Sequence, residues 1–107
     1  MQYLIIGSDG PGFTEPEEAI EVLEQGIIPT FEMIEQLRAD GSIIAGGLPV
    51  GEREFIFIIE ATSNEAVDDM LRELPAWGAF EWDVTPLQSF ERRAVKEQEM
   101  LTKIKGW

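Results

Sequence analysis

The chain has 107 residues and a net charge of −13, with neither cysteine nor histidine. From its length we expect a single domain. The negative charge repels nucleic acid and anionic membranes, so we expect neither as a partner. The absence of cysteine and histidine excludes disulfides, thiolate chemistry and histidine-ligated metals. No apolar run approaches the roughly 20 residues of a membrane span, and the N-terminus lacks a secretion-signal pattern, so we expect a cytoplasmic protein.

Residues 2–6 have the composition of a strand that is apolar on both faces. Because side chains alternate along a strand, Tyr3 and Ile5 face one way, and Leu4 and Ile6 face the other. The following Gly-rich loop has neither a P-loop nor a dinucleotide-binding order, which favours a simple turn.

A long helix is expected from the capping-box pattern of residues 14–17, with Pro16 close to the first helical position. Apolar side chains then recur with helical spacing: Ile20, Leu23, Ile27, Phe31 and Ile34. Pro29 lacks an N–H group, so we expect either a kink or two shorter helices meeting there, and Gly41 ends the element.

Two further strands are expected at residues 42–48 and 54–60, joined by a turn at residues 49–51. The second strand is again apolar on both faces. Its side chains divide into Phe55, Phe57 and Ile59 on one face and Ile56 and Ile58 on the other.

Residues 62–65 start a second helix that Pro75 stops, and a last strand follows in which aromatic and acidic residues alternate from Phe80 onwards. The first 90 residues hold 18 acidic and three basic side chains, whereas residues 91–107 hold three acidic and five basic ones. We therefore divide the chain into a domain of residues 1–90 and a helical arm of residues 91–107. The arm could dock on an acidic body or remain a solvated helix.

The order of elements is β-α-β-β-α-β, which predicts a ferredoxin-like α+β domain with a four-stranded antiparallel sheet and two helices on one face. The other face would then expose large apolar side chains, each of which stabilises by roughly 1.5–3 kcal/mol when buried. We therefore predict at least a homodimer, a dimeric α/β barrel in which two sheets pack face to face and enclose a hollow.

Three segments resemble the muconolactone delta-isomerase family: Gly-Ser-Ile-Ile-Ala-Gly-Gly at 41–47, Leu-Pro-Ala-Trp at 74–77 and Phe-Glu-Trp-Asp-Val-Thr-Pro-Leu at 80–87. The resemblance spans about residues 1–90. It implies subunits that assemble through their sheets and an enzyme that moves a proton within an unsaturated lactone carrying a carboxylate, without metal or cofactor. The chain departs from the family in its loops at residues 7–16 and 49–53 and in its C-terminal arm.

Such a reaction requires a base, an anchor for the substrate carboxylate and a dry pocket. Glu60 is the candidate base, because it ends an apolar strand where loss of water would raise its pKa; the alternative is a strand-end residue in solvent. Arg38 lies near the apolar stripe of its helix and could grip a carboxylate, or it could cap the last turn.

Three other side chains are weaker candidates. Tyr3 could donate a hydrogen bond to an enolate oxygen or simply pack in the core. Arg53, beside the turn, could bind substrate or remain solvated, and Trp82 could line a pocket or belong to the core.

Three functions remain open on the sequence. The first is a cofactor-independent isomerase acting on a small lactone or oxo-acid. The second is a cofactor-independent monooxygenase-like enzyme on the same barrel, since a fold does not fix the chemistry. The third is a non-catalytic ligand-binding or assembly module.

Overall fold

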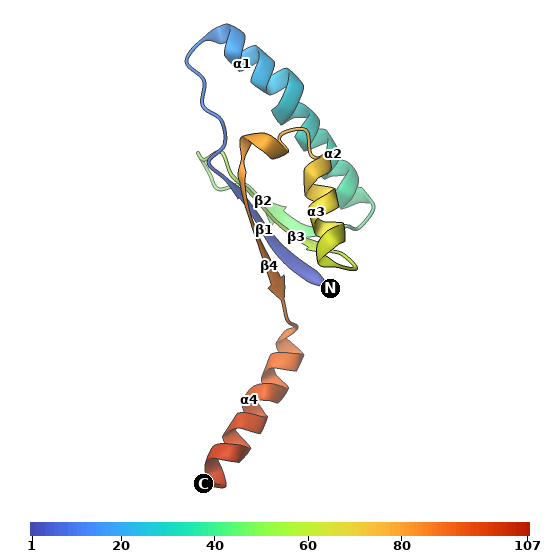
Figure 1. The fold of residues 1–107 in the computed structure, drawn as a ribbon, viewed down its shortest axis with the longest axis vertical. Coiled ribbons are helices and arrows are strands. Elements are labelled where there is room, and N and C mark those ends of the chain that lie inside the picture. The colour runs from blue at the N-terminus through green and yellow to red at the C-terminus, as the bar shows by residue number, and fades with distance from the viewer.

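The computed structural model describes residues 1–107 and contains one four-stranded antiparallel sheet with the order β2-β3-β1-β4 (Figure 1). The strands are β1 (Gln2–Ser8), β2 (Ile43–Gly47), β3 (Phe55–Glu60) and β4 (Glu81–Leu87). Helices lie between β1 and β2 and between β3 and β4, in the order expected from the sequence. The α+β, ferredoxin-like fold is therefore confirmed.

The two central strands, β1 and β3, are apolar on both faces. Tyr3 and Ile5 lie opposite Ile59 and Phe57 across the strands, and all four are buried under the helices. On the other face, Leu4 and Ile6 lie opposite Ile58 and Ile56, and all four remain partly exposed. We call this second surface the open face, because no helix of the chain covers it.

The long helical segment consists of α1 (Pro16–Val22), the π-helix η1 (Leu23–Ile27) and α2 (Ile28–Ala39). The wider π turn ends just before Pro29, which has no N–H to place in an α-helical ladder. The predicted interruption at Pro29 is thus confirmed. The capping box was wrong, because the N-cap is Glu15 and no side chain bonds the helix start.

The helix α3 (Asn64–Glu73) starts where the sequence predicts, with the Ser63 hydroxyl accepting a hydrogen bond from the backbone N–H of Ala66. Val67 and Leu71 are buried in the same core as the helix-covered face of the sheet. A short 3₁₀ turn, η2 (Trp77–Ala79), then leads into β4.

Thr30 joins the two helical segments from inside the core. Its fully buried hydroxyl oxygen accepts a hydrogen bond of 2.9 Å from the backbone N–H of Ala76, just after α3. A buried N–H group without a partner would destabilise the fold, so this hydrogen bond holds the segment that follows α3 against α2.

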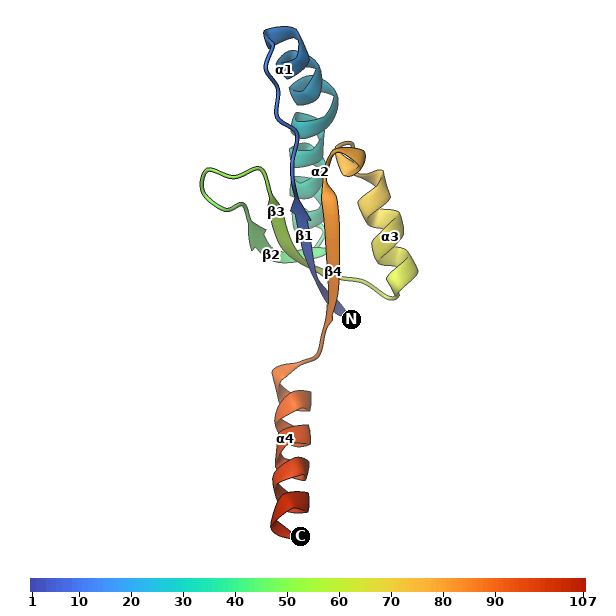
Figure 2. The ribbon, with the colours of Figure 1, turned by 60° about the vertical axis from the view of Figure 1, so that its left-hand side comes forward.

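The last helix, α4 (Phe90–Lys105), extends away from the sheet, at the opposite end of the molecule from α1 (Figures 1 and 2). The chain accordingly measures 68 × 28 × 22 Å along its principal axes. No residue of α4 is buried. None of the helices in the structure combines the length and the apolar character required to cross a membrane.

Candidate functional site

Two adjoining pockets lie on the helix-covered side of the sheet. The first, of about 200 Å³, opens between α2 and the strands β2 and β3. The second, of about 220 Å³, lies between η1, the loop after β1 and the β2–β3 connection. Three apolar side chains line both pockets: Phe31, Leu48 and Phe55. Taken together, the two pockets fall in the lower part of the range of roughly 300–1,000 Å³ that is typical of ligand sites.

Arg38 lines the first pocket from the last turns of α2. Its Nη1 lies 3.0 Å from Oε1 of Glu35, and the Arg38 side chain is 61% exposed. An exposed ion pair of this kind contributes little to stability. The guanidinium can therefore exchange Glu35 for the carboxylate of a ligand at small cost.

Arg53 lines the second pocket and holds two loops together. Its Nη1 donates a hydrogen bond to the carbonyl oxygen of Pro11, and its guanidinium carbon lies 4.6 Å from the centroid of the Phe13 ring. Stacking on an aromatic ring orients the guanidinium while leaving donors free for a ligand.

Glu52 and Glu54 flank Arg53 and also line the second pocket. The protonated Glu54 carboxyl can donate a hydrogen bond to the Glu52 carboxylate, which raises the pKa of Glu54, and partial loss of water and the negative charges of Glu52 and Asp9 raise it further. A carboxyl group with a raised pKa is suited to acid–base chemistry. Sequence analysis missed this pair, although the run Glu52-Arg53-Glu54 was a visible signal.

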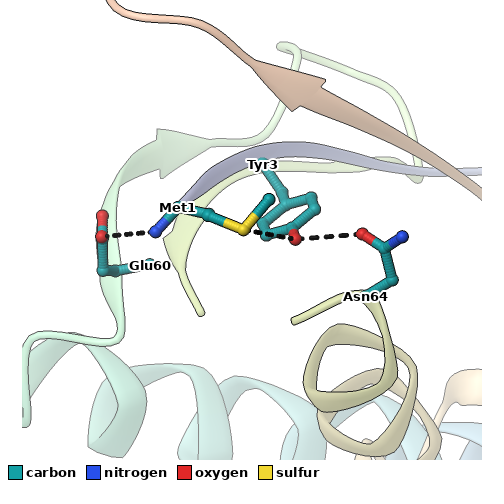
Figure 3. Close-up of polar contacts among 4 residues, drawn as sticks. All are labelled: Met1, Tyr3, Glu60 and Asn64. Atoms are coloured by element: carbon teal, nitrogen blue, oxygen red, sulfur yellow. Dashed lines mark hydrogen bonds and ion pairs between the residues drawn. The ribbon is translucent and has the colours of Figure 1, made fainter. Parts of the chain in front are cut away.

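Glu60 lies elsewhere, at the end of β3. Its Oε1 lies 2.9 Å from the N-terminal amine of Met1, and half of its side chain is exposed (Figure 3). Glu60 lines neither pocket, so the structure does not bring it together with Arg38. Its role as a base, in a hollow between two sheets, stays a prediction.

Tyr3 is fully buried beneath the helices. Its hydroxyl lies 3.0 Å from Oδ1 of Asn64 and 3.7 Å from the sulfur of Met1 (Figure 3). The shorter contact makes Asn64 the acceptor of its single O–H. The hydroxyl is therefore occupied in this chain, and a catalytic role for Tyr3 also stays a prediction.

Trp82 packs on the helix-covered side of β4. Its indole N–H donates a hydrogen bond of 2.9 Å to the carbonyl oxygen of Trp77, and its ring lies against Phe57 and Phe80. Phe80 lines the second pocket, whereas Trp82 does not. Trp82 therefore supports the pocket wall from behind, and its predicted contact with substrate stays a prediction.

The chain thus forms a ferredoxin-like domain that has two adjoining apolar pockets with an arginine at each. The sequence matches the muconolactone delta-isomerase family over residues 14–93. The chain therefore belongs to this family. The match ends early in α4, so most of the arm lies beyond it.

Two solved structures share the fold. A muconolactone isomerase is 19% identical with a TM-score of 0.66, and the alignment covers 83% of this chain and 90% of that one. A 5-chloro-2-hydroxyhydroquinone dehydrochlorinase from Burkholderia phenoliruptrix AC1100, in complex with 2,5-dihydroxybenzoquinone, is 21% identical with a TM-score of 0.64, covering 86% and 98%. No curated protein matches the sequence.

We expect Gly7→Ala to destabilise the fold. A Cβ at Gly7 would lie 2.5 Å from the ring of Trp82, so the indole that supports Phe80 must shift. Overpacking of this kind costs about 1–3 kcal/mol, measurable by chemical denaturation. Gly47→Ala is the matched control, because a Cβ there meets nothing within 4 Å. Equal losses in the two variants would contradict the prediction.

Proposed function

We propose that this protein is a cofactor-independent isomerase that moves a proton on a small, unsaturated, anionic ring compound, such as a lactone or a related oxo-acid. Membership of the muconolactone delta-isomerase family supports the reaction class. The observation that carries the proposal is the placement of Arg38 and Arg53 at the two adjoining pockets.

Charge explains why these two arginines matter. Residues 1–90 contain 18 acidic and only three basic side chains, so most of this surface repels an anion. The third base, Arg72, stacks on Trp77, pairs with Asp68 and lines neither of the two pockets. Arg38 and Arg53 are consequently the cations of this segment best placed to hold a substrate carboxylate.

The chemistry then follows from the second pocket. Arg53 holds the substrate carboxylate, and the ionised carboxylate of Glu54 takes a proton from a carbon beside the carbonyl group. Negative charge passes to the carbonyl oxygen, and the proton returns from Glu54 to a different carbon. Glu52 raises the pKa of Glu54 and thereby strengthens it as a base. No atom is gained or lost overall, as isomerisation requires.

Self-association would create a second, separate hollow on the open face of the sheet. We infer that two copies pack their open faces together, because Leu4, Ile6, Ile56 and Ile58 otherwise remain in contact with water. In such a pair, Glu60 would lie at the margin of the sheet-to-sheet interface. Glu60 is thus the alternative base, in a hollow formed by two subunits, whereas Tyr3 lies on the helix-covered face of the sheet.

Elimination of hydrogen chloride is a second candidate function. The similarity in fold to a dehydrochlorinase favours it, because elimination also begins with removal of a proton. Here the electron pair left behind would expel chloride from the neighbouring carbon instead of collecting a proton.

The first experiment follows exchange of protons from muconolactone into deuterated water by NMR. The wild type should exchange protons and isomerise the lactone, and Glu54→Gln should lower the rate at least ~100-fold because it removes the general base. Glu60→Gln is the matched comparison. A loss of proton exchange in that variant alone would identify Glu60, and not Glu54, as the base. Binding without exchange would indicate a ligand-binding module, and chloride release from a chlorinated hydroxyquinol would favour elimination.

The pH dependence gives a separate prediction. Activity should rise with pH as Glu54 loses its proton, at a pH above the usual value of 4.5 for a glutamate because its pKa is raised. Glu52→Gln removes the neighbouring negative charge, so the pKa of Glu54 should fall and the rise in kcat/KM should move to lower pH. An unchanged profile would contradict Glu54 as the base.

Self-association is tested by sedimentation at micromolar concentration, where the wild type should be at least dimeric. Ile58→Glu places a charge in the open face of each copy and should raise the dissociation constant at least ~100-fold, given roughly 1.5–3 kcal/mol per buried side chain. Val50→Glu, in a fully exposed loop position, is the control. A monomeric wild type would contradict the interface.

A further inference from the structure

The helix α4 exposes a large apolar surface in the isolated chain. Phe90 and Trp107, at its two ends, are each 93% exposed. Four more apolar side chains between them are about half exposed: Val95, Met100, Leu101 and Ile104. A soluble helix with this much apolar surface and no buried residue is normally covered by another molecule.

The same helix carries most of the positive charge of the protein. Residues 91–107 hold five of the eight basic side chains. At roughly 100° per residue, Arg92, Lys96 and Lys103 fall on one stripe, and Met100 and Ile104 follow beside it. Lys96 is paired with Glu99 of the same helix and Arg93 with Glu97, but both ion pairs are exposed and can be exchanged at small cost. The arm therefore presents a basic stripe next to an apolar one, which suits an apolar surface with an acidic margin.

The open face has such a margin at one end. Glu81 lies opposite Ser8 in the sheet, and Asp83 lies opposite Ile6, beside the apolar patch. The neighbouring carboxylate of Asp9 raises the pKa of the Glu81 carboxyl group. These three carboxylates, which we call the acidic margin, have no basic partner among the ion pairs of the chain.

The arm and the acidic margin lie at opposite ends of the same sheet. The strand β4 begins at Glu81, opposite Ser8, and ends at Leu87, opposite Gln2, just before α4. The arm then continues away from the sheet (Figures 1 and 2). In the conformation observed, α4 therefore cannot reach the acidic margin of its own chain.

A second copy removes this difficulty. If two open faces pack around a two-fold axis perpendicular to the strands, the Leu87 end of each sheet lies over the Ser8 end of the other. Each arm then leaves its own subunit beside the acidic margin of its partner. Because both arms make the same contact, the two copies exchange their arms with each other and leave neither arm free to bind a third copy.

We propose that α4 docks on the open-face end of a second copy of this chain, with its basic stripe on the acidic margin and its apolar stripe beside the apolar patch. The proposal rests on the open-face pairing inferred above. It goes beyond the family similarity, which ends at residue 93. Pairing of two arms with each other is less favourable, because each arm carries an excess of positive charge.

The absence of cysteine from the chain makes cross-linking a direct test. Differently tagged Lys96→Cys and Glu81→Cys chains are mixed, allowed to exchange subunits and treated with a short bismaleimide. We expect a mixed cross-linked dimer at least tenfold more abundant than for Lys96→Cys with Glu65→Cys, which places the second thiol on exposed α3. Equal yields, or Lys96→Cys chains linked mainly to each other, would overturn the proposal.

A charge swap is the second test, and sedimentation is its readout. The triple change Arg92→Glu, Lys96→Glu and Lys103→Glu should weaken the dimer about tenfold, and adding Glu81→Lys with Asp83→Lys should restore it. A persistent dimer without cross-link or rescue would overturn arm docking but leave the open-face interface standing. A wild type that sediments as a monomer would overturn both.

Discussion

The structure depends on a sheet whose two central strands are apolar on both sides. The helices cover one side, where Tyr3, Ile5, Phe57 and Ile59 form the core with Val67 and Leu71. The other side keeps its aliphatic residues partly exposed. Burial of each large apolar side chain would stabilise the protein by roughly 1.5–3 kcal/mol. The open face therefore favours a covering layer of protein, which the chain does not itself supply. The assembly and the arm are two consequences of this one imbalance.

The site depends on the helix-covered side. The rings of Phe31, Phe55 and Phe80 form a chain of contacts, with centroid distances of 5.3 and 5.1 Å, between the long helix and the sheet. The pockets open around these rings, and Leu23 and Ile27 of the π turn line the second pocket. An apolar floor with an arginine at each opening is a physical basis for binding a flat anion, since the rings exclude water and the guanidinium groups supply charge.

Much of the fold could be predicted because it depends on local patterns. Alternation in residues 2–6 and 54–60 identified both double-sided strands, and proline positions located the helix interruption and the end of α3. The N-cap was wrong, since Glu15 rather than Thr14 precedes α1. The site was less predictable because its contacts join distant segments. Arg53 bonds Pro11 across 42 positions, and Tyr3 bonds Asn64 across 61. Helical phase alone predicts the position of Arg38 on α2, whereas the placement of Glu52 and Glu54 at a pocket depends on the shape of a loop.

Charge links the site to the assembly. Two copies of a chain with a net charge of −13 repel each other at long range. An arm with more bases than acids, placed on a partner's carboxylates, lowers this repulsion where the two bodies are closest. Since the surface potential of residues 1–90 stays negative elsewhere, an anionic substrate is still directed to the arginines at the pockets. Placing most of the basic residues in the arm thus favours association without creating competing anion sites on the body.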